Sequence, residues 1–274
     1  MDLVSIVIPV FNRKDLVSKS VDSALSQSYS NVEIIIVDNN STDGTFEFLF
    51  QKYGNEPKIR LFKNEKNIGP VKNWIRGIEE AKGKYIKLLF SDDWLDTNYI
   101  ESAAKFFFKS ETIGLFYTPA LIHSNNSKKL FYKSYKNEKI VSSNSFITKL
   151  LLGYKTPVSP GCAIFYKNLL LESLHIVVDE EKHDLYLKYG AGIDLLCYLN
   201  SANKKDKICF ISNTYAHFFS HKGSFTTSKK LRKYYKSTKL YFINKSMKPP
   251  KSLLFKFIVF LDLDRIIVQL SNRL

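Results

Sequence analysis

VSIVIPV (residues 4–10) and VEIIIVD (residues 32–38) are two apolar runs in which most residues are β-branched, and they decide the fold. Continuous runs of this kind are typical of strands buried on both faces of a parallel sheet. Between them, Val17, Val21 and Ala24 recur at helical spacing. The order strand, helix, strand indicates a parallel pair, because parallel strands need a long crossover connection.

The same alternation continues through the first 90 residues. After the second run comes the polar segment NNSTDG (39–44). Ser41 or Thr42 can cap a helix there, and Asp43 can meet the positive end of its dipole. The other expected elements are a strand in KIRLFKN (58–64), a helix over about 70–81 and a strand in YIKLLF (85–90). This βαβαβαβ series predicts an α/β fold with an open, mostly parallel sheet that is flanked by helices.

A polar cluster follows each expected strand. In open parallel sheets, ligands bind beyond the carboxyl ends of the strands. We therefore expect the four clusters to form one site. They are PVFNRKD (9–15), DNNSTDG (38–44), NEKNIG (64–69) and SDDW (91–94).

The pattern is less regular after residue 110. GLFYTPALIH (114–123) and CAIFYK (162–167) look like strands, and GIDLLCYLNSA (192–202) looks like a helix. Residues 228–270 read as a basic, aromatic-rich helical tail in which two prolines, Pro249 and Pro250, separate two helices.

Composition excludes several classes of protein. The 274 residues are 45% hydrophobic and contain no fixed-period repeat, so a compact mixed fold is expected. The three cysteines form no CxxC pair, which argues against a disulfide framework or a zinc knuckle. The first 15 residues lack the layout of a signal peptide, so we expect a cytoplasmic location. Charges interrupt the apolar segment 253–270, and we do not expect it to span a membrane.

The net charge of +15 is concentrated in one segment. From Lys222 to Lys251 there are ten Lys or Arg and no Asp or Glu. Such a segment attracts polyanions, either nucleic acid or the anionic inner leaflet of a membrane. In the membrane case, Tyr and Phe of the tail would lie at the headgroup level. The alternative is a solvated helical face. Charge alone does not decide among nucleic acid, a membrane surface and a solvated face.

Asp92 and Asp93 place two adjacent carboxylates at the end of the fourth strand. Such a pair repels unless a cation or hydrogen-bond donors compensate. Oxygen ligands with room for water and phosphate suit Mg²⁺ or Mn²⁺. The alternative is that one of the two residues only caps the following helix.

Three long stretches together resemble a known family. In order and spacing they are similar to the nucleotide-sugar-binding half of family 2 glycosyltransferases of the GT-A fold. The resemblance implies a nucleotide-sugar-binding half at 1–110, an acceptor-side half of the same domain at 111–227, and a basic amphipathic helical tail at 228–274. The stretches are VSIVIPVFNRKDLVSKSVDSALSQSYSNVEIIIVDNNSTDGT (4–45), NEKNIGPVKNWIRGIEEAKGKYI (64–86) and LLFSDDWL (88–95).

The resemblance also implies donor contacts. Pro9 to Asn12 would form the wall beside the nucleobase, largely through backbone groups. Asn39 stands where the family usually has a second aspartate, which binds uracil, and Asn can still pair with a base edge. Lys72 could neutralise phosphate charge or could be a solvated lysine. The implied donor-binding residues are Pro9, Val10, Phe11, Asn12, Asp38, Asn39, Asn67, Lys72, Asn73, Ser91 and Asp92.

A metal ion, Mn²⁺ or Mg²⁺, is implied at the fourth strand end. Phe90 stands where the family's metal motif often has its first acid. Asp93 would then bind the metal through the diphosphate, while Asp92 holds the ribose or orients the site. HKGSFTTS (221–228) resembles a late family segment, which makes His221 a metal ligand, with His217 as the alternative.

Transfer with inversion needs a base for the acceptor hydroxyl. The family usually supplies it from a Glu-Asp pair at a helix start, and this chain offers only Asp194 there. The alternative is that Asp194 only interacts with the helix dipole. The rival candidates lie in VVDEEKHDLYLKYG (177–190) and are Asp179, Glu180, Glu181 and Asp184.

The resemblance implies an inverting, metal-dependent hexosyl- or N-acetylhexosaminyltransferase. Its partners would be a nucleotide-diphosphate sugar, a glycan or lipid-linked oligosaccharide acceptor, and the anionic inner membrane surface, but no nucleic acid. The product would be O-antigen, capsule or another bacterial surface polysaccharide. A nucleic-acid-binding protein is the alternative from another class, although no such motif is visible. A sugar nucleotidyltransferase is disfavoured because PVFNRKD (9–15) contains no glycine.

Overall fold

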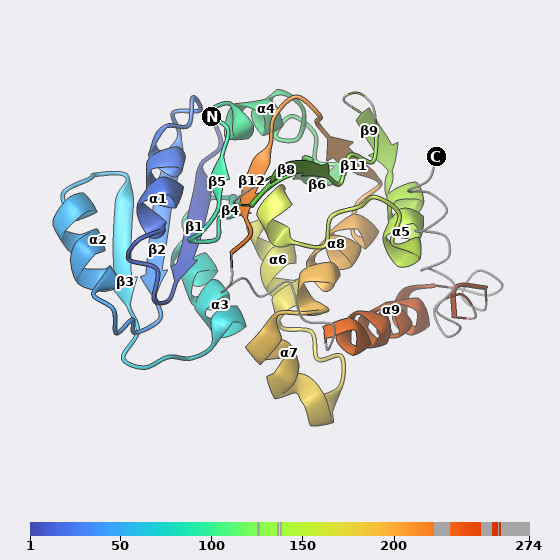
Figure 1. Cartoon of the computed structure of the whole chain (residues 1–274). Helices are drawn as coiled ribbons and strands as arrows, with labels where there is room; N and C mark the ends of the chain where they lie inside the picture. Colours follow the sequence, from blue (N-terminus) through green and yellow to red (C-terminus); the bar gives the residue numbers. More distant parts are fainter. Residues whose placement is uncertain are drawn as a thin grey trace.

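The computed structural model describes residues 1–124, 127–135, 137, 139–221, 231–247, 254–256 and 258. Figure 1 shows the first half of the chain, in blue to cyan, beside the second half, in green to red. The predicted alternation of the first half is confirmed. Its elements are β1 (Val4–Val10), α1 (Val17–Leu25), β2 (Val32–Asp38), α2 (Thr45–Tyr53), β3 (Ile59–Lys63), α3 (Pro70–Glu80) and β4 (Tyr85–Leu88).

The second half mixes strands and helices less regularly. Its first elements are β5 (Trp94–Leu95), α4 (Tyr99–Phe106), β6 (Ile113–Tyr117), β7 (Ala120–Ser124), β8 (Ser127–Phe131), β9 (Lys139–Ser142) and α5 (Ser143–Leu152). The short helix η1 (Pro160–Cys162), β10 (Ala163–Tyr166), α6 (Lys167–Leu174), the short helix η2 (Glu180–Lys182) and α7 (His183–Tyr189) follow. The last described elements are α8 (Ile193–Asn203), β11 (Lys207–Phe210), β12 (Ala216–Phe219) and α9 (Arg232–Ser246).

The strands form two sheets. The large sheet has the order β3-β2-β1-β4-β10-β6-β11-β9, and the small sheet has the order β5-β12-β7-β8. The strands β1 to β4 are mutually parallel, as predicted, while β10 runs antiparallel to β4 and to β6. The expected strand GLFYTPALIH is in fact two strands, β6 and β7, that belong to different sheets. Pro119 separates them, and proline lacks the N–H that a continuing ladder needs.

Both faces of the large sheet are buried. Along β1, Val7 belongs to one apolar cluster, with Trp74 and Ile78 of α3. Its neighbour Ile6 belongs to the other cluster, with residues of α1, α2 and α4. Side chains on a strand alternate between faces, so the continuous apolar run of β1 serves two cores.

The start of α2 differs from the prediction. The helix begins at Thr45, after Gly44 with a φ of 83°, so neither Ser41 nor Thr42 caps it. Asp43 Oδ1 instead accepts the Thr45 N–H at 3.0 Å. The residues before Gly44 therefore form a loop. Gly44 connects this loop to the helix in a left-handed conformation, which glycine adopts without steric cost.

The described part of the basic tail packs on the protein. In α9, Tyr234, Phe242 and Ile243 are buried and belong to the cluster that includes α8. The expectation that aromatic residues here lie at the lipid headgroups is therefore wrong for Tyr234 and Phe242. Pro249, Pro250 and most of the remaining tail lie outside the described residues. Within the described ranges, no helix combines the length and apolar character needed to cross a bilayer.

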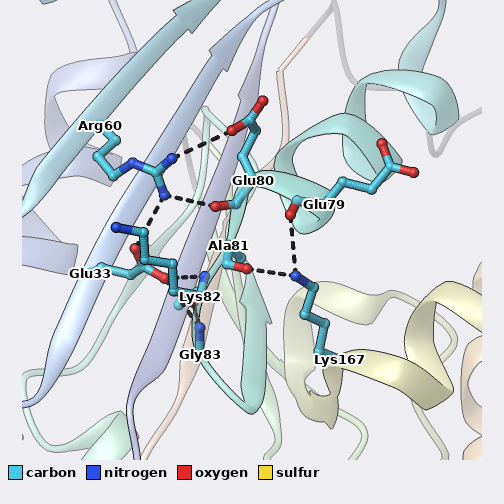
Figure 2. Close-up of polar contacts among 9 residues, drawn as sticks. Glu33, Arg60, Glu79, Glu80, Ala81, Lys82, Gly83 and Lys167 are labelled. Carbon is cyan, nitrogen blue, oxygen red and sulfur yellow. Dashed lines mark hydrogen bonds and ion pairs between the residues drawn. The ribbon is translucent and has the colours of Figure 1, made fainter.

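One carboxylate joins three strands at the end of the sheet where β4 begins (Figure 2). Glu33 of β2 accepts hydrogen bonds from the Ser5 hydroxyl at 2.7 Å and the Gly83 N–H at 3.2 Å. Its other oxygen lies 3.5 Å from Arg60 Nη1 of β3. A Cβ on Gly83 would lie 2.6 Å from Ser5 Oγ and 2.7 Å from the Leu3 carbonyl oxygen. Only glycine permits this approach, so the turn into β4 is fixed.

Replacing this carboxylate should destabilise the protein. Glu33→Ala leaves the Ser5 hydroxyl and the Lys82 N–H without their acceptor, and we expect the free energy of unfolding to fall by about 2–4 kcal/mol. Urea denaturation measures it. Glu111→Ala is the control, because Glu111 is 86% exposed and 3.6 Å from Lys84, and it should cost less than about 1 kcal/mol. Equal effects of the two changes would contradict the role of Glu33.

Candidate active site

Loops after β1 and β2 are tied together at the carboxyl edge of the large sheet. Val10 and Asp38 are register partners at the ends of these strands. The Asn12 N–H donates to Ser41 Oγ at 2.9 Å, and the Thr42 N–H donates to Asn12 Oδ1 at 2.8 Å. Asn12 has a φ of 50°, which asparagine tolerates better than most residues. The two predicted clusters therefore form one surface.

The first loop divides into buried and exposed residues. Pro9 and Val10 are buried in β1, so only Phe11, which is 40% exposed, offers a large apolar side chain to a ligand. The side chain of Asn12 is used within the loops. Of the four residues predicted to lie beside a nucleobase, largely through backbone groups, Phe11 also has an exposed apolar side chain.

Asp38 and Asn39 are held within the protein. Asp38 is fully buried, its Oδ1 accepts the Ser41 N–H at 2.8 Å, and its Oδ2 has no partner among the described residues. Asn39 Oδ1 accepts the Ile68 N–H at 2.9 Å, and Asn39 Nδ2 donates to Asn67 Oδ1 at 2.9 Å. The predicted pairing of Asn39 with a base edge would have to compete with these bonds.

A network of asparagines shapes the donor-side loops. Asn64 Nδ2 donates to Asn39 Oδ1 at 2.9 Å and to Asn73 Oδ1 at 2.8 Å. Asn73 Nδ2 donates to the Val37 carbonyl oxygen at 3.0 Å. Asn73 is therefore a buried link between α3 and β2 rather than a pocket-lining residue, whereas Lys72 beside it is exposed. Sequence reasoning missed Asn64, although it opens the NEKNIG cluster.

The turn after β4 is anchored from two sides. From α1, Ser20 Oγ donates to the Asp93 carbonyl oxygen at 2.6 Å. From β12, the Phe219 N–H donates to Asp93 Oδ1 at 3.0 Å. Ser91 is buried in the turn, 7% exposed. The helix that follows begins at Tyr99 after Asn98, so neither Asp92 nor Asp93 caps it.

His221 is the histidine that meets the carboxylate pair. His221 Nε2 lies 2.9 Å from Asp92 Oδ2, and each side chain is about one fifth exposed, 20% and 19%. The alternative, His217, is instead hydrogen-bonded to Asp96 and His123. In the described ranges, no three or more His, Cys, Asp and Glu side chains are grouped as metal ligands. The geometry thus supplies a carboxylate pair and one imidazole at the predicted place.

Phe90 fills the position of the missing acid with an apolar contact. Its ring lies 5.4 Å from that of Trp74 on α3. Trp74 in turn packs against Gly190, where an added Cβ would lie 2.7 Å from its ring. Phe90 therefore contributes to packing between α3, β4 and the loop before α8, and offers no ligand atom.

A buried lysine lies under the carboxylates. Lys87 of β4 is fully buried, and its Nζ donates to the Gly161 carbonyl oxygen. Burial lowers the pKa of Lys87 to about 7, and the charge of Asp93 opposes that shift. Burial, and then the charge of Asp92, raise the pKa of Asp93 well above its usual range. Lys87 was not among the predicted site residues, although its place inside YIKLLF indicates burial.

Asp194 lies at the start of α8 as predicted. Its Oδ1 accepts the N–H groups of Gly192 at 2.8 Å and Leu195 at 2.7 Å, and its Oδ2 accepts the Tyr235 hydroxyl at 2.6 Å. Burial raises the pKa of Asp194 to about 7, while the hydrogen bond from Tyr235 lowers it. The carboxylate therefore serves the helix start and also titrates near neutral pH.

The rival acidic cluster is on the surface. Asp179 pairs with Lys182 at 2.7 Å, and the other members are exposed in η2 and α7. The hydrogen bond from Lys182 lowers the pKa of Asp179. A carboxylate held ionised by a lysine is a weaker proton acceptor than one with a raised pKa, so Asp194 fits the base role better.

Known proteins resemble this chain along most of its length. It is 30% identical over 233 residues to an uncharacterized glycosyltransferase, MG025, of Mycoplasma genitalium, which covers 82% of the chain and 71% of the relative. It is 28% identical over 230 residues to the Escherichia coli UDP-Glc:alpha-D-GlcNAc-diphosphoundecaprenol beta-1,3-glucosyltransferase WfaP, with 84% and 82% covered. A Pasteurella multocida chondroitin synthase is 38% identical over 116 residues, but the chain covers only 12% of that relative.

Solved structures share the fold. S. aureus TarS in complex with UDP-GlcNAc gives a TM-score of 0.72 at 16% identity, with 93% of this chain and 70% of that chain covered. The mannosyltransferase PcManGT from Pyrobaculum calidifontis, in complex with GDP-Man and Mn²⁺, gives 0.59 at 16% identity, with 95% and 69% covered. These likenesses confirm the predicted GT-A type of fold.

A match between the sequence and a family model identifies the family, and that family agrees with this fold. The model described as Glycosyl transferase family 2 matches residues 5–174, more than half of the chain, and the part matched contains the strand ends with Asp38 and Asp93. The chain belongs to glycosyl transferase family 2.

Proposed function

We propose that the protein transfers a hexosyl or N-acetylhexosaminyl group from a nucleotide-diphosphate sugar to a glycan acceptor, with inversion at the anomeric carbon. The observation that carries this proposal is the arrangement at one edge of the sheet. The strands β1, β2 and β4 are parallel neighbours. Asp92, which contacts His221, and Asp93, which accepts from the Phe219 N–H, follow the end of β4. Family membership supports it. So does the fold shared with TarS, which was solved with UDP-GlcNAc.

The acceptor that fits best is a sugar linked through diphosphate to a lipid. WfaP, similar over most of both chains, is named for such an acceptor. Chondroitin synthase, similar over a shorter part, is named for a polysaccharide. The product would then be a bacterial surface polysaccharide such as O-antigen or capsule.

The donor contacts would fall on exposed side chains of the loops. Phe11 offers an apolar face to the nucleobase. Lys72 and Asn67 are exposed on the donor side, where a lysine can neutralise diphosphate charge. The buried members, such as Asp38 and Asn73, hold these loops in place.

Mn²⁺ or Mg²⁺ would be held by Asp93, with Asp92 and His221 beside it. The site fits a cation because Asp93 is buried next to a second carboxylate, and burial, then the charge of Asp92, raise the pKa of Asp93. A divalent ion supplies neutralisation of the charge on the departing nucleoside diphosphate. PcManGT, of similar fold, was solved with Mn²⁺.

Asp194 would accept the proton of the acceptor hydroxyl. A base works best when its pKa is near the operating pH, and that of Asp194 is about 7. Tyr235 holds the carboxylate at 2.6 Å and would tune its basicity.

The enzyme would work at the anionic inner surface of the plasma membrane. The net charge of +15 and the ten Lys or Arg from Lys222 to Lys251 support this. On α9, Lys233 and Lys245 are exposed, so they can contact anionic lipid although Tyr234 and Phe242 of that helix are buried.

Removal of Asp93 should abolish turnover that depends on metal. We expect a screen of UDP-, dTDP- and GDP-sugars to reveal nucleotide release with Mn²⁺ or Mg²⁺ and none in EDTA. Asp93→Ala should lower that rate about 100-fold or more with the fold retained by circular dichroism. Asp206→Ala, at an exposed aspartate before β11, is the control and should keep full activity. Undiminished activity of Asp93→Ala or of the wild type in EDTA would contradict the metal site.

A base at Asp194 has its own pH signature. Because a base acts when deprotonated, transfer should rise with pH through about 7, the pKa of Asp194, and Asp194→Asn should lower it by roughly 10²–10⁴-fold. Tyr235→Phe removes a hydrogen bond that lowers this pKa, so its pH profile should shift to higher pH. Steady-state rates from pH 5 to 9 measure both effects. If Asp194→Asn keeps full activity, the base role passes to the cluster of Asp179, Glu180, Glu181 and Asp184.

Binding to membranes should depend on charge. The full-length protein should float with vesicles that contain phosphatidylglycerol and stay behind with phosphatidylcholine alone, and salt should weaken the binding by screening. The double change of Lys233→Gln and Lys245→Gln should reduce flotation. Equal behaviour with both kinds of vesicle would refute the membrane proposal.

A further inference from the structure

A second polar cluster lies on one face of the small sheet, outside the carboxylate pair. Trp94 of β5 is the register partner of His217 on β12, and His123 of β7 is the register partner of Lys128 on β8. His217 is also the partner of Leu121, two residues before His123. Directly opposed residues, and residues two apart on one strand, share a face. We call the set of Trp94, His123, Lys128 and His217 the Trp94 face.

The histidines of this face form a hydrogen-bonded chain that starts at a carboxylate. His217 Nε2 lies 2.8 Å from Asp96 Oδ1, and His217 Nδ1 lies 2.9 Å from His123 Nε2. Since a carboxylate only accepts, His217 must donate from Nε2. A neutral His217 then accepts from His123, so the chain ends at Nδ1 of His123. The second oxygen of Asp96 accepts the Tyr215 N–H at 2.8 Å.

Positive charge on this face exceeds negative charge. Lys19 of α1 places its Nζ 3.0 Å from the centre of the Trp94 ring, and Lys128 is exposed. Burial, and then the nearby charges of Lys128 and Lys19, lower the pKa of His123. Across the described residues, neither Lys19 nor Lys128 forms an ion pair within 4 Å of a carboxylate. An anion placed between these groups would relieve their mutual repulsion.

The Trp94 face lies directly beside the proposed sugar-transfer site. Trp94 follows Asp93 in the chain, and His217 precedes Phe219 by two residues on β12. That step spans roughly 7 Å along a strand. The Phe219 N–H holds Asp93, and the ring of Phe219 lies 5.5 Å from that of His221. An anion bound between Lys19 and Lys128 therefore lies on the same surface as the carboxylate pair, displaced from it along the small sheet.

We propose that the Trp94 face binds the phosphate groups of the acceptor, the diphosphate that joins its first sugar to the lipid. The inference rests on the proposed function, because it assigns a place to the anionic part of that acceptor. Lys128 and Lys19 would contact phosphate oxygens, and the sugar would extend along β12 toward Asp93. An anionic membrane headgroup offers the same phosphate chemistry, so the test must separate the two.

Farnesyl diphosphate, with UDP and Mn²⁺ present to fill the donor site, is the probe. Its binding is followed by tryptophan fluorescence in a Trp74→Phe background, which leaves Trp94 as the reporter among the two tryptophans of the chain. Lys128→Gln should weaken binding about tenfold or more, the usual loss for a hydrogen bond to a charged group. Lys129→Gln is the matched control, since adjacent residues of a strand face opposite sides, and it should bind as the parent does.

The outcomes separate this inference from the proposed function. Donor hydrolysis without acceptor should be unchanged in Lys128→Gln, because Lys128 is outside the donor site. Equal affinity of Lys128→Gln and Lys129→Gln for farnesyl diphosphate would overturn the inference while leaving sugar transfer intact. So would a loss seen only with phosphatidylglycerol vesicles, which would assign the face to headgroups. Conversely, a failure of the wild type to hydrolyse any nucleotide sugar would overturn the proposed function, whatever the probe shows.

Discussion

The hydrogen bond from the Phe219 N–H to Asp93 Oδ1, 3.0 Å long, joins the two sheets of this protein. Asp93 ends the segment that leaves the large sheet, and Phe219 ends β12 of the small sheet. The turn that carries Asp93 is also fixed to α1 by Ser20. Because three separate elements meet at one residue, the carboxylates of Asp92 and Asp93 are presented at a defined place, and His221 follows from β12 to meet them.

This arrangement carries an electrostatic cost that is only partly offset. Asp93 is buried beside Asp92, and the buried Lys87 below it has a pKa lowered to about 7. Removing charges from water costs several kcal/mol for each ion unless partners compensate. A domain selected for stability alone would place apolar residues at these positions. Charges that remain buried at a ligand edge of a sheet are typical of a functional site.

Sequence patterns predicted the parts of the fold that depend on local periodicity. The alternation up to β4, and the joining of the loops that carry Asn12 and Ser41, follow from apolar runs and from parallel topology. Contacts between distant segments were not predictable in this way. The pairing of Asp96 with His217 links residues 121 positions apart, and Lys87 was missed because lysine is usually exposed.

The roles of single residues depend on their neighbours in the fold, which the sequence does not reveal. Phe90 is explained by Trp74, which packs on it from α3. The predicted base-edge contact of Asn39 competes with bonds to Asn64 and Asn67. Tyr234 and Phe242 of α9 carry the pattern of a membrane-facing helix but are buried in the domain. In each case a tertiary contact decided between two roles that one residue type can play.

The central claim is that a nucleoside diphosphate and a divalent ion bind where the two sheets meet. A crystal structure of the full chain with UDP and Mn²⁺ tests it most directly. We expect Mn²⁺ within about 2.0–2.6 Å of a carboxylate oxygen of Asp93, with the diphosphate on its far side and the nucleobase near Phe11. Nucleotide bound elsewhere, or metal bound without contact to Asp93, would contradict it.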